Sequence, residues 1–223
     1  MSFLPKERSS IKNTRQFRRI QVRTLAALVF PGFQTLDYFG PIEMLGDPAY
    51  EIEVTTVAAT SDPVPSRHGQ KIVPDVTMAE RTNYDLLFIP GGDSALKECT
   101  TSDTLQWIRD ASENAERVMA VCTGTIVLGM AGVLDGRRAT TNKLDFTSTV
   151  HLAPKVNWVK QARWVEDGKF FTSSGVSAGI DMALGVLANL YGEEEAEKTA
   201  FGCEYTWHRD PNEDPFAKLV GLV

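Results

Sequence analysis

The sequence lacks the signatures of several common protein classes. No apolar run approaches the roughly eighteen residues of a membrane helix, so we expect no membrane partner. The three cysteines form no C-x-x-C pair and the three histidines are scattered, so we expect no disulfide framework and no metal site. Without G-x-G-x-x-G a dinucleotide cofactor is not expected either. Unpaired cysteines and the lack of a signal region predict a cytoplasmic protein.

Positive charge is scarce outside the first residues. The 223-residue chain carries a net charge of −6, yet residues 1–23 hold seven Lys and Arg against a single Glu. The remainder is therefore acidic, and we expect no nucleic acid partner, because phosphate binding needs clustered basic side chains. We read residues 1–21 as a basic N-terminal arm, and a transit peptide is the alternative.

Apolar runs alternate with helical patterns along the rest of the chain. Strands are expected at 22–30, 50–59, 84–90 and 117–122, with hairpins at 66–77 and 162–175. Helices are expected at 35–45 with a Gly-Pro break, at 101–115 capped by Ser102 or Asp103, at 123–132, near 142, at 177–192 capped by Ser177, and last at 192–206. This alternation predicts one α/β domain over residues 22–223, with a mostly parallel sheet covered on both faces.

Cys122 stands where an apolar strand ends and a helix of small residues begins. This is the setting of a nucleophile elbow, in which a sharp turn lifts the side chain above the sheet. A thiol there faces the amino end of a helix, where N–H groups favour the thiolate, and the Thr123 N–H would point at an anion on the substrate. A buried core cysteine is the alternative.

Two more loops follow strands and should open into the same crevice at the sheet's carboxyl edge. Asp37, among apolar neighbours, is either a helix cap or a carboxyl with a raised pKa that can deliver a proton. Glu43 competes for that role but is expected to be solvated or salt-bridged. Gly91 and Gly92 could bring backbone N–H groups close to a substrate, or could simply form a turn.

Four segments in this order resemble the ThiJ/PfpI superfamily, which is related to class I glutamine amidotransferases. They are FPGFQTLDYFGPIEML, DLLFIPGGD, VMAVCTGTIVLGMAGVLDGRRATT and SSGVSAGIDMAL. The similarity spans about residues 22–205 and is nearest to the isocyanide hydratase branch.

The resemblance implies a flavodoxin-like three-layer sandwich that forms a homodimer and acts on a small molecule. It places Cys122 as the nucleophile and Asp37 as its partner acid. Gly92 and Thr123 take the positions whose N–H groups form the oxyanion pocket, and Val176 that of an apolar residue beside the cysteine. The chemistry implied is addition of water to an isocyanide, which gives an N-substituted formamide.

One departure from the family pattern concerns the residues after Thr140-Thr141. Relatives commonly have His there, whereas this chain has Asn142 followed by Lys143. Without the imidazole no base stands beside the thiol, which weakens glyoxalase and peptidase readings, and both residues would alter the pocket wall.

We therefore expect a cofactor-independent hydro-lyase that hydrates an isocyanide or similar small electrophile. The alternatives are a redox or stress-responsive protein with an oxidisable cysteine, and a glyoxalase-like enzyme. A regulatory half of a transcription factor ranks last, because we expect no room for a helix-turn-helix module.

Overall fold

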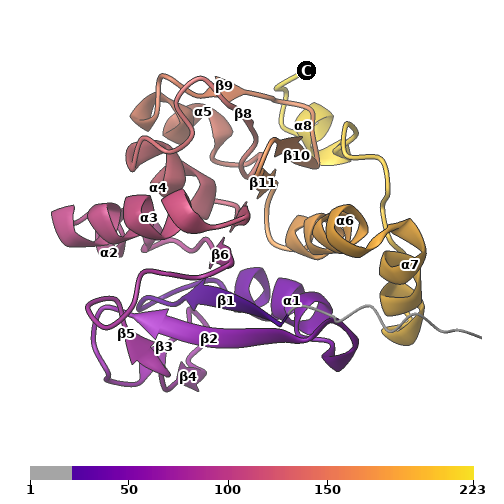
Figure 1. Cartoon of the computed structure of the whole chain (residues 1–223). Coiled ribbons are helices and arrows are strands. Elements are labelled where there is room, and N and C mark those ends of the chain that lie inside the picture. Colours follow the sequence, from indigo (N-terminus) through magenta and orange to yellow (C-terminus); the bar gives the residue numbers. More distant parts are fainter. Residues whose placement is uncertain (1–21) are drawn as a thin grey trace, which may run out of the picture.

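A seven-stranded sheet forms the centre of the computed structural model, which describes residues 22–223 (Figure 1). The strand order is β10-β11-β7-β6-β1-β2-β5, and every neighbouring pair is parallel except β10 and β11. The strands are β1 (Arg23–Leu28), β2 (Ile52–Ala58), β5 (Val76–Thr77), β6 (Leu86–Ile89), β7 (Arg117–Val121), β10 (Trp164–Asp167) and β11 (Phe170–Ser173). The predicted N-terminal arm, and with it the transit-peptide alternative, lies outside the described residues.

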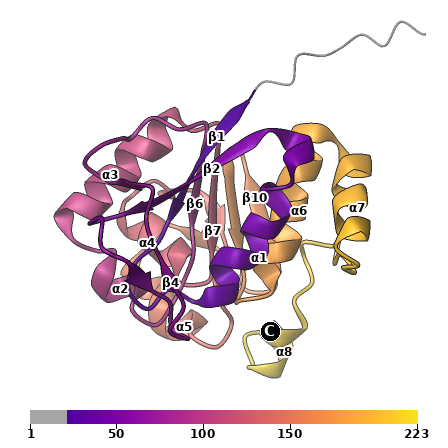
Figure 2. The ribbon, with the colours of Figure 1, turned by 90° about the horizontal axis from the view of Figure 1, so that it is seen from below.

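Helices cover both faces of this sheet, as Figure 2 shows. One layer holds α1 (Thr35–Leu45), α6 (Ala178–Tyr191) and α7 (Glu193–Gly202), and the other holds α2 (Ala95–Glu98), α3 (Ser102–Asn114) and α4 (Gly124–Met130). Leu25, Phe88 and Met119 in the central strands are fully buried, as continuous apolar strands between two helix layers require. The expected α/β, flavodoxin-like three-layer sandwich is confirmed.

Short elements complete the chain outside the three layers. Two small sheets pair β3 (Val64–Pro65) with β4 (Lys71–Ile72), and β8 (Arg138–Ala139) with β9 (Asn157–Trp158). The hairpin expected over residues 66–77 therefore spans residues 64–72, because β5 pairs with β2 in the main sheet instead. The remaining turns are α5 (Phe146–Thr149), α8 (Pro215–Leu219), η1 (Pro48–Tyr50) and η2 (Val150–Leu152).

The structure corrects several predicted helix limits. The Gly-Pro break predicted in α1 is absent, since the helix continues through Pro41. The helix packs tightly on α6 at this point, where a Cβ on Gly40 would lie 2.8 Å from the Ile180 side chain. The cap of α3 is Thr101, whose hydroxyl accepts from the Thr104 N–H at 3.3 Å, rather than Ser102 or Asp103. Ser177 holds the cap position of α6 without a capping hydrogen bond.

Two further corrections concern the ends of helices. The helix predicted near Asn142 begins only at Phe146, because the Asn142 side chain accepts the Asp145 N–H at 3.1 Å and forms a local turn instead. The helix at 193–202 is not the last, since α8 follows. The sequence signals for α8 are Asp214, which caps the helix, and Pro215 in its first turn.

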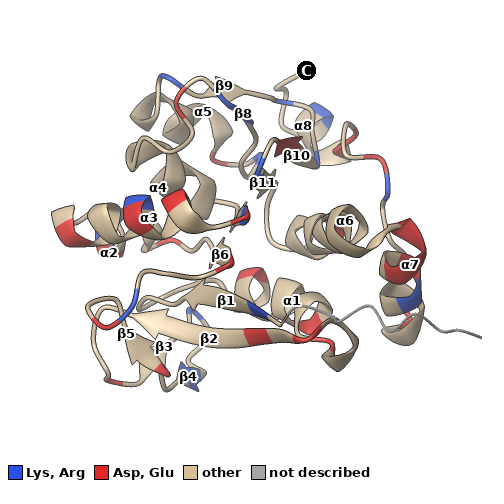
Figure 3. Ribbon diagram, viewed as in Figure 1, with Lys and Arg blue, Asp and Glu red and all other residues tan. Residues whose placement is uncertain are grey.

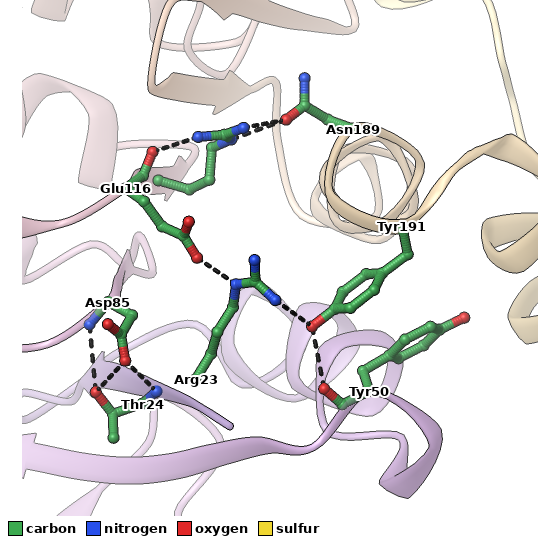
Figure 4. A network of polar contacts seen from close by, with 8 residues as sticks. Arg23, Thr24, Tyr50, Asp85, Glu116, Asn189 and Tyr191 are labelled. Carbon is green, nitrogen blue, oxygen red and sulfur yellow. Dashed lines mark hydrogen bonds and ion pairs between the residues drawn. The ribbon is translucent and has the colours of Figure 1, made fainter. Parts of the chain in front are cut away.

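A polar network links the amino end of β1 to the last residue of α6 and to the turn that precedes β2 (Figure 4). Arg23 pairs with Glu116 and donates to the Tyr191 hydroxyl at 3.2 Å, which in turn donates to the Tyr50 carbonyl at 3.0 Å. This network lies at the amino edge of the sheet, so it stabilises the fold rather than serving the carboxyl edge, where ligands bind.

Charged residues of both signs are interspersed over the described chain (Figure 3). The first turn of α7 carries Glu193, Glu194 and Glu195, which suits the positive end of a helix dipole. None of the helices within residues 22–223 is both long and apolar enough to cross a membrane.

Candidate active site

Cys122 occupies the turn between β7 and α4. Its φ of 57° lies in the left-handed region, which non-glycine residues seldom adopt, and this strain is typical of a nucleophile elbow. Gly124 allows the turn to be tight, because a Cβ there would come within 2.6 Å of the Ile89 carbonyl oxygen. The predicted elbow is therefore present, with Cys122 at its tip and 8% exposed.

Two donors reach the Cys122 sulfur. The Asn142 side-chain Nδ2 lies 3.1 Å from Sγ, and the Thr123 backbone N–H also donates to it. Asn142 is itself held by Asp145, since Nδ2 donates to Asp145 Oδ2 at 3.0 Å and Oδ1 accepts the Asp145 N–H. Asp145, which the sequence reasoning missed, thus orients the group that contacts the nucleophile.

Asp37 lies behind Gly91, on the side away from solvent. Its side chain is fully buried, Oδ2 accepts the Gly91 N–H at 3.0 Å, and Oδ1 has no partner. A Cβ on Gly91 would lie 2.8 Å from both Asp37 Oδ2 and Cys122 Cβ, so only glycine lets the carboxyl and the cysteine approach each other. Burial raises the pKa of Asp37 to about 7, as the sequence reasoning proposed for a proton donor.

The protonation of Cys122 differs from the sequence expectation. Burial, and then the charge of Asp37, raise its pKa to about 12, although the Asn142 and Thr123 donors lower it. The seven-residue helix α4 therefore does not make the resting sulfur a thiolate. Because an ionised Asp37 opposes an ionised Cys122, the two groups compete for negative charge, and their protons are coupled.

The predicted oxyanion donors are only partly open. The Gly91 N–H is taken by Asp37, and the Gly92 N–H donates to Thr123 Oγ1 at 2.9 Å. Thr123 Oγ1 also donates to the Gly92 carbonyl at 3.0 Å, which locks this hydroxyl in place. Of the predicted donors, the Thr123 N–H faces the sulfur, while a role for Gly92 stays a prediction that requires the Thr123 hydroxyl to turn away.

A cavity of about 680 Å³ opens above Cys122, within the usual size of a small-molecule site. Its wall includes Gly92, Thr123, Asn142 and Val176, but the fully buried Asp37 contributes none of it. The loops after β1, β6 and β7 meet here, as their position at one sheet edge predicted.

Val176 is strained where it borders this cavity. It has a φ of 44°, and a β-branched residue rarely adopts this conformation. Glu43 is exposed, as expected, and takes no part in the site.

Lys143 and Arg67 belong to the cavity wall as well. The Lys143 ammonium donates to Thr140 Oγ1 and the Ala162 carbonyl, both at 2.7 Å, and burial lowers its pKa to about 8. Arg67, which the sequence reasoning did not single out, forms an ion pair with Asp93 at 3.0 Å. Within residues 22–223 no group of three or more His, Cys, Asp or Glu side chains is placed to hold a metal ion.

A parallel α/β sandwich with a cysteine on the elbow above its carboxyl edge defines a class of proteins with a reactive thiol. Residues 23–189 match the model of the DJ-1/PfpI family, and the chain belongs to this family.

Named relatives have different activities. The chain is 36% identical over 180 residues to the isonitrile hydratase of Pseudomonas putida, covering 80% of this chain and 76% of that protein. It is 30% identical to the HTH-type transcriptional regulator CdhR of Pseudomonas aeruginosa, covering 76% of this chain and 51% of the regulator.

Solved structures agree with this assignment. A ThiJ/PfpI family protein from Pseudomonas syringae superimposes with a TM-score of 0.77 at 30% identity, covering 91% of this chain and 82% of that one. Drosophila melanogaster DJ-1beta shares the fold with a TM-score of 0.74 at 21% identity, covering 84% of this chain and all of that one.

Proposed function

We propose that the protein is a cofactor-independent hydro-lyase that adds water to an isocyanide and releases an N-substituted formamide. The observation that carries the proposal is the close approach of Asp37, a carboxyl with a raised pKa, to Cys122. Cys122 itself stands on a strained elbow at the base of a cavity. The similarity to an isonitrile hydratase supports the same chemistry.

The first step joins Cys122 to the substrate. The sulfur bonds to the terminal isocyanide carbon, which gains one proton, so that the thiol has in sum added S–H across one carbon to give a thioimidate. Asp37 is shielded from the cavity, so it can protonate the isocyanide carbon only where that carbon is bonded to the Cys122 sulfur. The Asp37 carboxylate left by this transfer then takes up the proton that Cys122 loses. An acid with a pKa of about 7 can make both transfers near neutral pH.

The second step regenerates the enzyme. Water adds to the thioimidate carbon, the C–S bond breaks, and the sulfur regains a proton as the formamide leaves. The Thr123 N–H and Asn142 Nδ2, which contact the sulfur in the resting protein, stabilise the negative charge it carries as it departs. The oxyanion role proposed for Gly91 and Gly92 would require their N–H groups to leave their present acceptors.

Other activities have less support at this site. The Asn142 amide cannot accept the thiol proton as an imidazole would, which disfavours glyoxalase and peptidase chemistry. Oxidation of a sensor cysteine also begins from a thiolate, and burial raises the pKa of Cys122, so this reading needs the same loss of the thiol proton as the hydratase and has no further observation at the site in its favour.

The assembly and location of the protein stay proposals. We propose a homodimer, supported by the exposed Leu36 and Phe39 side chains on α1, which are 40% and 42% accessible. A reducing, cytoplasmic setting would suit the described cysteines, all of which are free. Light scattering during size-exclusion chromatography would show a single-chain mass if the dimer proposal is wrong.

Formamide production from an alkyl isocyanide tests the proposed activity. Wild type and Cys203→Ala, in which an exposed cysteine far along the chain is removed, should produce formamide at equal rates, while Cys122→Ala should be inactive. Equal rates for Cys122→Ala and wild type would end the proposal.

A further inference from the structure

The C-terminal segment after α7 reaches the same cavity as Cys122. Phe216 and Val220, on and just after α8, line the cavity together with Cys122 and Asn142. This segment lies beyond residues 23–189, which match the family model. In Figure 2 the chain enters β1 at the top, and α5 and α8 lie at the opposite end of the sheet.

Buried polar contacts fix the first part of this segment to the domain. Asp181 on α6 is fully buried, and Oδ1 accepts the Tyr205 hydroxyl at 3.0 Å and the His208 N–H at 2.9 Å. Its Oδ2 pairs with Arg163 at 2.6 Å, so the carboxylate that holds the segment is itself neutralised and oriented.

Further contacts continue to the start of α8. The Pro211 carbonyl accepts the Arg163 N–H at 2.8 Å, and the Asp214 N–H donates to the Gln161 carbonyl at 2.9 Å. Asp214 then caps α8 by accepting the Phe216 N–H. The segment is therefore built into the domain up to Asp214, and these contacts fix the point where α8 begins.

The two faces of α8 differ in exposure: one packs against the domain and the other borders the cavity. Ala217 is fully buried against the domain, whereas Phe216 and Val220, four residues apart and hence on one face, border the cavity with 53% and 37% of their surface accessible. Leu219, 76% accessible, is not part of the cavity wall. Covering this exposed apolar surface with an apolar ligand removes it from water and so favours binding.

We infer that α8 is the specificity wall of the site, and that Phe216 and Val220 select substrates whose non-reacting group is a hydrocarbon. Leu144 and Val176 contribute further apolar surface to the cavity, while the polar groups around Cys122 receive the reacting end. The isocyanide part of this inference rests on the proposed function. The wall itself does not, because it concerns any apolar reagent that reaches the cysteine.

Maleimides test the wall without relying on isocyanide turnover. The second-order rate of Cys122 alkylation would be measured by peptide mass spectrometry with N-methylmaleimide and N-cyclohexylmaleimide, which differ in their hydrocarbon group. At about 680 Å³ the cavity has room for a one-ring molecule, so removing the Phe216 ring withdraws a contact rather than relieving a clash. Phe216→Ala should lower the cyclohexyl rate about 5- to 30-fold relative to the methyl rate, and Val220→Ala should lower it less.

Leu219→Ala on the same helix is the matched control and should leave the ratio of the two rates unchanged. Circular dichroism would verify the fold of each variant. An unchanged ratio in folded Phe216→Ala, or an equal loss in Leu219→Ala, would overturn the inference. If no isocyanide is turned over, the proposed function fails, yet the ratio still decides whether the wall exists. If isocyanides are turned over with an unchanged ratio, the wall alone is wrong.

Discussion

Asn142 donates a 3.1 Å hydrogen bond to the Cys122 sulfur. An amide donates to sulfur but cannot remove its proton, so this contact stabilises a charged sulfur without acting as a base. The thiol proton of Cys122 must then pass to Asp37.

Removal of the Asn142 amide should make the Cys122 thiol less reactive. Asn142→Ala deletes one of two donors to the sulfur, so the pKa of Cys122 should rise and its alkylation by iodoacetamide at pH 8 should slow about 3- to 10-fold. Asn157→Ala, at an exposed site, is the control. A faster reaction in Asn142→Ala would show that the amide does not stabilise the thiolate.

Gly91 should tolerate no side chain. In Gly91→Ala the new Cβ would lie 2.8 Å from Asp37 Oδ2, Cys122 Cβ and the Thr123 nitrogen, so the elbow must shift. We expect a loss of more than about 100-fold in kcat/KM, because small displacements of reacting groups are costly. Gly202→Ala, whose Cβ meets nothing within 4 Å, should retain activity. Full activity of Gly91→Ala would show that the close approach is unimportant.

The buried Asp37 should make the protein less stable as the pH rises. Its pKa is about 7 in the folded protein against 3.8 for a carboxyl in water, so between these values the folded state binds more protons than the unfolded state. This contribution to stability is fully present below about pH 4 and is lost as the pH rises through 7. Urea unfolding of wild type and Asp37→Asn should give free energies whose difference changes by a few kcal/mol over this window. A difference that does not depend on pH would contradict the raised pKa.

Lys143 should have the opposite pH dependence at higher pH. Burial lowers its pKa from 10.5 to about 8, so between these values the unfolded chain binds more protons and the Lys143 contribution to stability rises with pH. Burial also raises the pKa of Cys122, so ionisation of this cysteine in the unfolded chain alters stability over the same pH range. The informative quantity is therefore the difference in free energy of unfolding between wild type and Lys143→Met. Wild type should gain stability relative to that variant from pH 8 to 10, and a constant difference would be the contrary result.

Much of the fold and the core of the site could be predicted from local sequence. Alternating apolar runs and helical patterns predicted the parallel sheet, because both faces of such a sheet are buried. The strand-to-helix boundary at Cys122 predicted the elbow, since small residues must follow a tight turn. The apolar neighbours of Asp37 predict either a helix cap or a carboxyl with a raised pKa, and the full burial of its side chain favours the second.

Other features depend on contacts between distant segments. The Gly92 N–H donates to a hydroxyl from residue 123, and the pKa of Cys122 is dominated by burial, so neither could be read from neighbouring residues. The role of Asp145 became visible only when its turn placed it against Asn142. Helix α8 had a recognisable cap, but its place at the cavity follows from the buried Asp181.

Detection of a covalent adduct on Cys122 tests the central claim most directly. The protein would be mixed with an alkyl isocyanide, quenched during turnover and digested for mass spectrometry. We predict that the Cys122 peptide gains the mass of one isocyanide, as a thioimidate requires, and that Cys122→Ala shows no such adduct. Formamide accumulating while the Cys122 peptide stays unmodified, or an adduct confined to Cys203, would contradict the account.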